Sequence, residues 1–272
     1  MTANSVTLHV DPPRIRHSLL ELSRFFAEAG SSVMLNPVMK LLPRGDGHSV
    51  MTLPGFFGAD GSTAFLRRFL KQQGYHALPW GLGRNTGEDG FGSMEDVLAF
   101  RAEVEGILAA KLDIEVRRSG RRVSLVGWSL GGLYATAMAH RYPDLVRQVI
   151  TLGTPFGDPR GTALYGVMSR MNNAEVTDEL LQEWMNYSFR GELQVPITAL
   201  YSESDGIVGD GIARCPDHRY MENIAVMASH VGFPFNPLVR ALVTERLSQP
   251  EGHWKPWQWR NFKPFMHRPV QG

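Results

Sequence analysis

A glycine-rich turn at residues 127–132 separates two segments with different patterns. The segment "RVSLVGW" (122–128) is apolar and rich in β-branched residues, which is typical of a buried strand. The segment "LGGLYATAMAHRY" (130–142) has the apolar spacing of a helix. Gly127 and Gly131 flank Ser129 at the junction, where a strand turning sharply into a helix leaves no room for side chains. The sequence therefore predicts a tight strand–turn–helix unit.

The same alternation of strand and helix continues along the chain. Strands are predicted at 49–55, 75–80, 146–156, 195–205 and 223–230. Helices are predicted at 14–29, 62–74 and 93–112. This order favours an α/β fold with a doubly wound, mostly parallel sheet that is covered by helices on both faces. Without an internal repeat or a low-complexity linker, residues 1–272 are expected to form a single domain.

The first predicted helix has a clear apolar face. It is expected to begin near residue 14 and to stop at Gly30. The segment after it is apolar but interrupted by Pro37 and Pro43. The residues that share the apolar face are Ile15, Leu19, Leu22, Phe25 and Phe26.

Two regions do not fit the alternating pattern. Residues 157–194 are about twice as long as a single crossover helix requires, so they predict a helical cap over the sheet. The C-terminal tail (250–272) is rich in tryptophan and basic residues, and its prolines exclude a regular helix. We expect the tail to pack along the domain surface, and the alternative is peripheral contact with a lipid interface.

Composition excludes several classes of function. Lys and Arg total 28 against 27 Asp and Glu, which gives no electrostatic reason to expect nucleic acid as a partner. Cys215 is the single cysteine, so neither an intramolecular disulfide nor a cysteine-based zinc site is possible. No cofactor and no metal are expected. We see no secretory signal and no apolar stretch near ~20 residues, which favours a cytoplasmic protein acting on small molecules.

The glycine-flanked serine also suggests chemistry. Held in a strained turn, Ser129 would have its hydroxyl raised clear of the sheet edge, next to a helix N-terminus with partial positive charge. A serine hydroxyl becomes a good nucleophile when a base removes its proton and an acid orients that base. The pattern therefore predicts a serine nucleophile with two partners elsewhere in the chain.

Candidate partners follow later strands in the expected order of acid and then base. Asp205 ends the segment "ALYSESD" (199–205), and His230 ends "NIAVMASH" (223–230). Parallel strands bring such positions to one edge of the sheet. The remaining candidates are Glu203 and Asp210 for the acid, and His218, His253 and His267 for the base.

An oxyanion formed at the substrate carbonyl needs two hydrogen-bond donors. The backbone N–H of Leu130, directly after the serine, is the first candidate. The second is the N–H of Phe56 in the turn "LPGFFGAD" (53–60), which follows the first predicted strand.

These segments together resemble the α/β-hydrolase fold, and more narrowly the bacterial triacylglycerol lipase and esterase group. By this resemblance Ser129 is the nucleophile, Asp205 the acid and His230 the base, with Phe56 and Leu130 at the oxyanion positions. One departure concerns the oxyanion loop, where many lipases have His-Gly and this chain has Pro54-Gly55. The matching segments are "LPGFFGADGS", "YHALPWGLGRNTG", "VSLVGWSLGGLYA", "VITLGTPF", "YSESDGIV" and "ENIAVMASHVGFPFNP".

The resemblance implies hydrolysis of carboxylic esters with apolar acyl chains through an acyl-enzyme. Acyl transfer or thioester cleavage would use the same three residues, and a non-catalytic binding protein would keep the fold without the reaction. Apolar side chains of the cap and the turns are expected to form the acyl pocket. The predicted pocket residues are Phe57, Trp80, Trp128, Met168 and Trp184.

Overall fold

A computed structural model describes residues 11–86, 94–163, 165 and 177–258. Six parallel strands form one sheet in the order β2-β1-β3-β4-β5-β6. Because the chain extends from the centre of the sheet in both directions, the sheet is doubly wound, and the predicted fold class is confirmed. The strands are β1 (Ser49–Leu53), β2 (His76–Pro79), β3 (Val123–Trp128), β4 (Val146–Leu152), β5 (Ile197–Tyr201) and β6 (Met221–Ala225).

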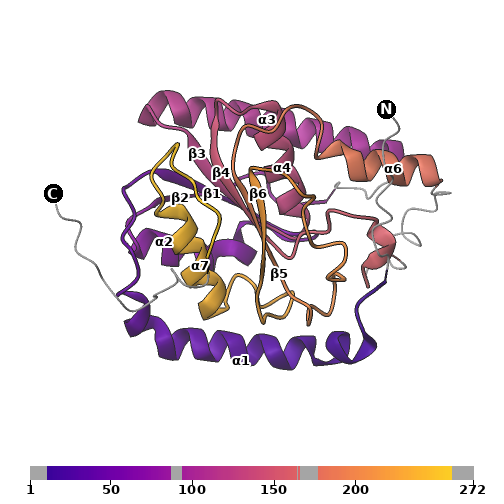
Figure 1. The fold of residues 1–272 in the computed structure, drawn as a ribbon, viewed down its shortest axis with the longest axis horizontal. Coiled ribbons are helices and arrows are strands. Elements are labelled where there is room, and N and C mark those ends of the chain that lie inside the picture. Colours follow the sequence, from indigo (N-terminus) through magenta and orange to yellow (C-terminus); the bar gives the residue numbers. More distant parts are fainter. Residues whose placement is uncertain (1–10, 87–93, 164, 166–176, 259–272) are drawn as a thin grey trace.

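Helices cover both faces of the sheet (Figure 1). The helices α3 and α4 pack on one face, and α2 and α7 pack on the other, with α1 outside α7. The helices are α1 (Ile15–Met39), α2 (Ala64–Gln72), α3 (Met94–Ser119), α4 (Leu130–Arg141), α6 (Asp178–Tyr187) and α7 (Pro237–Leu247). Two short 3-10 helices are η1 (Asp60–Thr63) and η2 (Pro159–Gly161).

Neighbouring residues of each strand enter opposite halves of the core. Val50 of β1 and Val126 of β3 join the apolar cluster that includes side chains of α2 and α7. Met51 and Leu125, one residue away in the same strands, join the cluster beneath α3 and α4. A parallel sheet buried on both faces explains why the strand segments read as continuous apolar runs.

The first helix is longer than its sequence pattern suggests. It continues through Gly30, so the prediction that this glycine ends the helix is wrong. A single glycine in an exposed helix costs only about 1 kcal/mol relative to alanine, which tertiary contacts offset. Pro37 lies within the last turn, where it lacks the N–H that would donate to the carbonyl four residues earlier.

Helix α7 follows β6 and was not predicted from the sequence. Its start nevertheless carries two ordinary signals: the Asn236 side chain accepts hydrogen bonds from the N–H groups of Leu238 and Val239, and Pro237 occupies the first position. Of the predicted cap, 157–194, the structure describes η2, α6 and their flanks, whereas 164 and 166–176 lie outside the described residues. Among the helices of the described ranges, none is long and apolar enough to cross a membrane.

Candidate active site

Ser129 occupies the turn between β3 and α4, with backbone angles of φ 53° and ψ −123°. Positive φ is uncommon for a residue with a side chain, and such strain persists where the surroundings enforce it. Here the Ser129 N–H donates to the carbonyl of Leu152 at the end of β4, 2.8 Å away. The serine is therefore fixed at the carboxyl edge of the central strands.

Close backbone packing explains the glycines around Ser129. A Cβ atom on Gly127 would lie 2.5 Å from the carbonyl oxygen of Gly131, and one on Gly131 would lie 2.5 Å from that of Leu53. Both contacts are closer than real Cβ atoms make, as the glycine pattern predicts. Thr154 adds a brace, because its hydroxyl donates to the Ser129 carbonyl at 3.0 Å.

Replacing Gly131 with alanine should destabilise the protein by about 1–3 kcal/mol, because the new methyl group meets backbone that has little freedom to move. The matched control is Gly106→Ala in α3, where no atom beyond the neighbouring backbone of the same helix lies within 4 Å of the added Cβ. That variant should be unchanged or more stable by up to about 1 kcal/mol. Urea unfolding measures both, and equal midpoints for the two variants would contradict the steric explanation.

Asp205 and His230 form a buried hydrogen-bonded pair. His230 Nδ1 and Asp205 Oδ2 are 2.7 Å apart, and the other carboxylate oxygen accepts the N–H groups of Ile207 and Val208 at 2.8 Å each. Burial alone would lower the pKa of His230, but the charges of Asp205 and Glu21 outweigh it and raise that pKa. The pair therefore has the geometry and charge of an oriented base.

The Asp205–His230 pair lies beside the serine turn. The Trp128 indole N–H donates to the His230 carbonyl at 3.0 Å, so the residue preceding Ser129 holds the histidine loop. Gly153, at φ 55°, makes room for the pair, since a Cβ there would lie 3.2 Å from His230 Nδ1. Among the hydrogen bonds within the described ranges, none joins the Ser129 hydroxyl to His230. Such bonds are often long in the absence of substrate.

The turn after β1 lies against the serine. A Cβ on Gly55 would be 3.0 Å from the Cβ of Ser129, which places the following residue, Phe56, at the site. The turn is closed by a hydrogen bond from the Gly58 N–H to the Gly55 carbonyl at 2.9 Å. Leu130 is the first residue of α4, so its N–H has no acceptor within the helix.

Asn85 holds the loop 54–58 in place. Its side-chain amide donates to the Pro54 carbonyl, and its backbone N–H donates to the Gly58 carbonyl, both at 2.8 Å. The side chain is fully buried. Sequence reasoning missed this residue, although a lone asparagine in the glycine-rich segment 81–92 was a usable signal. Asn85 thus braces a loop that has Pro-Gly in place of His-Gly.

Glu21 of α1 is a second residue that the sequence did not indicate. Its carboxylate accepts the N–H of Gly206 at 3.1 Å and the N–H of Val231 at 2.8 Å. These are the residues that directly follow Asp205 and His230, so one buried side chain connects the loop of Asp205 to the loop of His230. Burial raises the pKa of Glu21, and the nearby charge of Asp205 acts in the same direction.

A family comparison identifies the larger group to which this geometry belongs. Residues 32–268 match the model of the alpha/beta hydrolase family. The chain belongs to the alpha/beta hydrolase family. The superfamily predicted from the sequence motifs is therefore confirmed. Glu21 lies before the matched region, so the family model does not include the residue that connects the two loops.

Solved structures of other hydrolases share the fold. The mature lipase BlEst2 of Bacillus licheniformis is 20% identical with a TM-score of 0.54, and the alignment covers 75% of this chain and 94% of that one. Lipase B of Aspergillus fumigatus is 19% identical with a TM-score of 0.54, covering 76% and 54%. A soluble variant of monoglyceride lipase from Saccharomyces cerevisiae is 16% identical with a TM-score of 0.50, covering 75% and 87%. A comparison with curated protein sequences gives no match.

Among the described residues, the other candidate acids and bases of this alpha/beta hydrolase lie nearer the surface than the buried Asp205–His230 pair. Glu203 is exposed, and Asp210 forms a surface ion pair with Arg214 at 3.1 Å. His218 and His253 are exposed, and His267 lies outside the described residues. Within the described part of the chain, no cluster of three or more His, Cys, Asp or Glu could hold a metal ion.

The predicted pocket residues of the hydrolase have different surroundings. Phe57 is half exposed and Trp128 is partly buried beside His230, whereas Met168 lies outside the described residues. Trp80, which was predicted to contact substrate, has no exposed surface because it packs in the core beneath α3. Trp184 is likewise buried, with the guanidinium of Arg101 stacked 4.4 Å from its ring.

Proposed function

We propose that this protein is a serine hydrolase that cleaves carboxylic esters with apolar acyl chains. The observation that carries the proposal is the buried Asp205–His230 pair, held beside the strained turn that presents Ser129. The three lipase structures share the fold of this protein at 16–20% sequence identity. Their names as lipases are consistent with an ester substrate.

In the proposed reaction, His230 accepts the Ser129 proton as the hydroxyl oxygen attacks the ester carbonyl carbon. Asp205 holds the imidazole in the tautomer that leaves its other nitrogen free to act as base. The N–H groups of Phe56 and Leu130 stabilise the negative oxygen of the tetrahedral intermediate. The alcohol leaves with the proton from His230, and water then attacks the acyl-enzyme by the same route.

The test is hydrolysis of p-nitrophenyl esters over a range of acyl chain lengths, together with labelling by a fluorophosphonate probe. Turnover that varies with chain length, and a probe adduct on Ser129, would support the proposal. A folded sample that neither turns over esters nor reacts with the probe would instead favour a binding protein. Product analysis with added alcohols and with thioesters separates hydrolysis from acyl transfer and thioester cleavage.

The raised pKa of His230 predicts the acid side of the pH profile, because the base acts only when neutral. Activity should fall as the pH drops through a value above the ordinary histidine pKa. In Glu21→Gln one negative charge near the imidazole is lost, so this fall should move to lower pH. A profile of kcat/KM against pH measures the shift.

The control for this prediction is Glu28→Gln. Glu28 accepts hydrogen bonds from the Ser229 N–H and hydroxyl at 2.7 and 2.9 Å, so the change disturbs the same loop. Its charge is not among the causes of the His230 pKa shift. An equal displacement of the profile in both variants would show that loop disturbance, and not the charge of Glu21, is responsible.

A further inference from the structure

Helix α1 turns its apolar face away from the protein. Large apolar side chains repeat at helical spacing along its outer surface, and each of them is 64–81% exposed. These residues, here called the outer face, are Ile15, Leu19, Leu22, Phe26, Val33 and Met34. A surface helix normally buries such a face, so an exposed one indicates a binding surface.

The opposite, polar face of α1 is the one that packs against the domain. Besides the bridge made by Glu21, Ser18 donates to the Gly206 carbonyl at 2.6 Å and Arg24 donates to the Ser204 hydroxyl at 2.7 Å. Glu28 binds the loop of Ser229. These bonds fix the rotation of the helix, so its apolar side cannot turn inward without breaking them.

The charges exposed on α1 and the adjacent α2 are all basic. The two acids of α1, Glu21 and Glu28, face inward, and α2 contains no acid. The exposed bases that directly follow α1 or lie on α2 are Lys40, Arg44, Arg68 and Lys71. Asp46, close to Arg44 in sequence, is engaged by Arg121 and Arg147. At the N-terminal end, Asp11 and Glu203 line a wide cavity together with Arg14 and Arg16.

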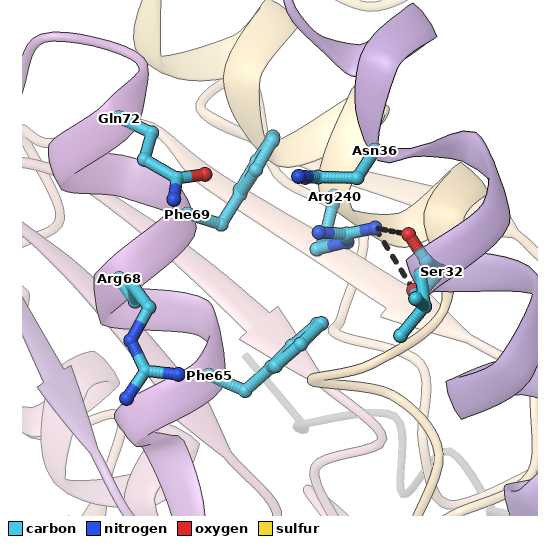
Figure 2. A pocket seen from close by; sticks show the side chains of 8 residues that line it. Ser32, Asn36, Phe65, Arg68, Phe69, Gln72 and Arg240 are labelled. Atoms are coloured by element: carbon cyan, nitrogen blue, oxygen red, sulfur yellow. Dashed lines mark hydrogen bonds between the residues drawn. The ribbon is translucent and has the colours of Figure 1, made fainter.

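A small cavity of about 150 Å³ adjoins the outer face between α1, α2 and α7 (Figure 2). Val33 of the outer face lines it, with Phe65 and Phe69 on the wall formed by α2. The buried Arg240 guanidinium lies 4.6 Å from the Phe69 ring and donates to the Ser32 hydroxyl at 2.9 Å. Among the described residues no carboxylate pairs with it, so it adds positive charge beneath this surface.

We propose that the outer face of α1, flanked by these bases, binds an anionic phospholipid surface. At about 1.5 Å per residue the helix is roughly 37 Å long, and it would lie in the plane of the interface with its apolar side chains inserted. Anionic headgroups would neutralise Lys40, Arg68 and their neighbours. A second copy of the chain meeting the same surface would instead bring bases against bases.

Vesicle co-sedimentation tests this proposal and requires no turnover, so its outcome is independent of the proposed ester hydrolysis. The wild-type chain should bind phosphatidylcholine vesicles containing phosphatidylglycerol. The double variant Leu22→Glu, Phe26→Glu should bind them at least about tenfold more weakly, because two charges replace inserted apolar groups. The matched control is Ile114→Glu, an equally exposed apolar position on α3, which should bind like wild type.

A charge-reversal variant tests the basic flank. Lys40→Glu with Arg68→Glu should weaken binding to the anionic vesicles by at least about tenfold. Wild type that fails to bind anionic vesicles, or outer-face variants that bind as well as wild type, would overturn the proposal. A wild-type dimer in light scattering that the double variant converts to monomer would show that a second copy covers this face, and would also overturn it.

Discussion

Replacing Ser129 with alanine should lower kcat for p-nitrophenyl ester hydrolysis by about four to six orders of magnitude. The substitution removes the one oxygen that the proposed mechanism uses as nucleophile. Alanine tolerates the backbone angles of the turn about as well as serine, so the fold should be retained. The rate is measured in single turnovers, with circular dichroism confirming the folded state.

The matched control is Ser23→Ala, on the exposed side of α1, where the hydroxyl donates to the Leu20 carbonyl of the same helix. Its kcat should match that of wild type. If Ser129→Ala keeps full activity, a different nucleophile performs the reaction and the proposed mechanism is wrong. Fluorophosphonate labelling of both variants separates loss of the nucleophile from loss of folding.

Asp205→Asn should reduce kcat by about 10⁴-fold while leaving the structure almost unchanged. The amide keeps an oxygen for the N–H groups of Ile207 and Val208. However, it presents either a weaker acceptor or an N–H donor to His230, which disfavours the tautomer needed in the base. The effect should appear in kcat far more than in KM, because the residue orients a catalytic group and does not contact the acyl chain.

Asp210→Asn provides the control for this second prediction. Asp210 belongs to the same loop, and its carboxylate pairs with Arg214 at the surface. The variant should retain activity within about twofold, because exposed ion pairs contribute little to stability. Loss of activity in Asp210→Asn with retention in Asp205→Asn would reverse the assignment of the acid.

The sequence predicted the features that depend on local pattern. A side chain on Gly127 would meet Gly131 within the same strand–turn–helix unit, and one on Gly131 would meet Leu53 of the neighbouring β1. Their spacing around Ser129 nevertheless reveals the turn in the sequence. The mostly parallel sheet could be predicted from the alternation of strands and helices alone. Asp205 and His230 could be selected because each follows a strand, and the structure brings them to within 2.7 Å of each other.

Features that depend on distant contacts could not be predicted in this way. Glu21 bonds to amides 185 and 210 positions further along the chain, and no local pattern records such a partner. The same contacts reverse the usual rule for an amphipathic helix, since the polar face of α1 is buried. Trp80 was assigned to the pocket as an aromatic side chain of a turn, but the path of the chain buries it under α3.

Because Glu21 lies on α1, the arrangement of Asp205 and His230 depends on the docking of that helix. Contacts between segments this far apart form only after long loops have closed, at a cost in chain entropy. In a molecule with a complete sheet but an undocked α1, the distance between Asp205 and His230 would therefore not be fixed by Glu21. Under the proposed mechanism, the fraction of active molecules therefore follows the docking equilibrium of α1, and partial opening at that end abolishes activity before the whole protein unfolds.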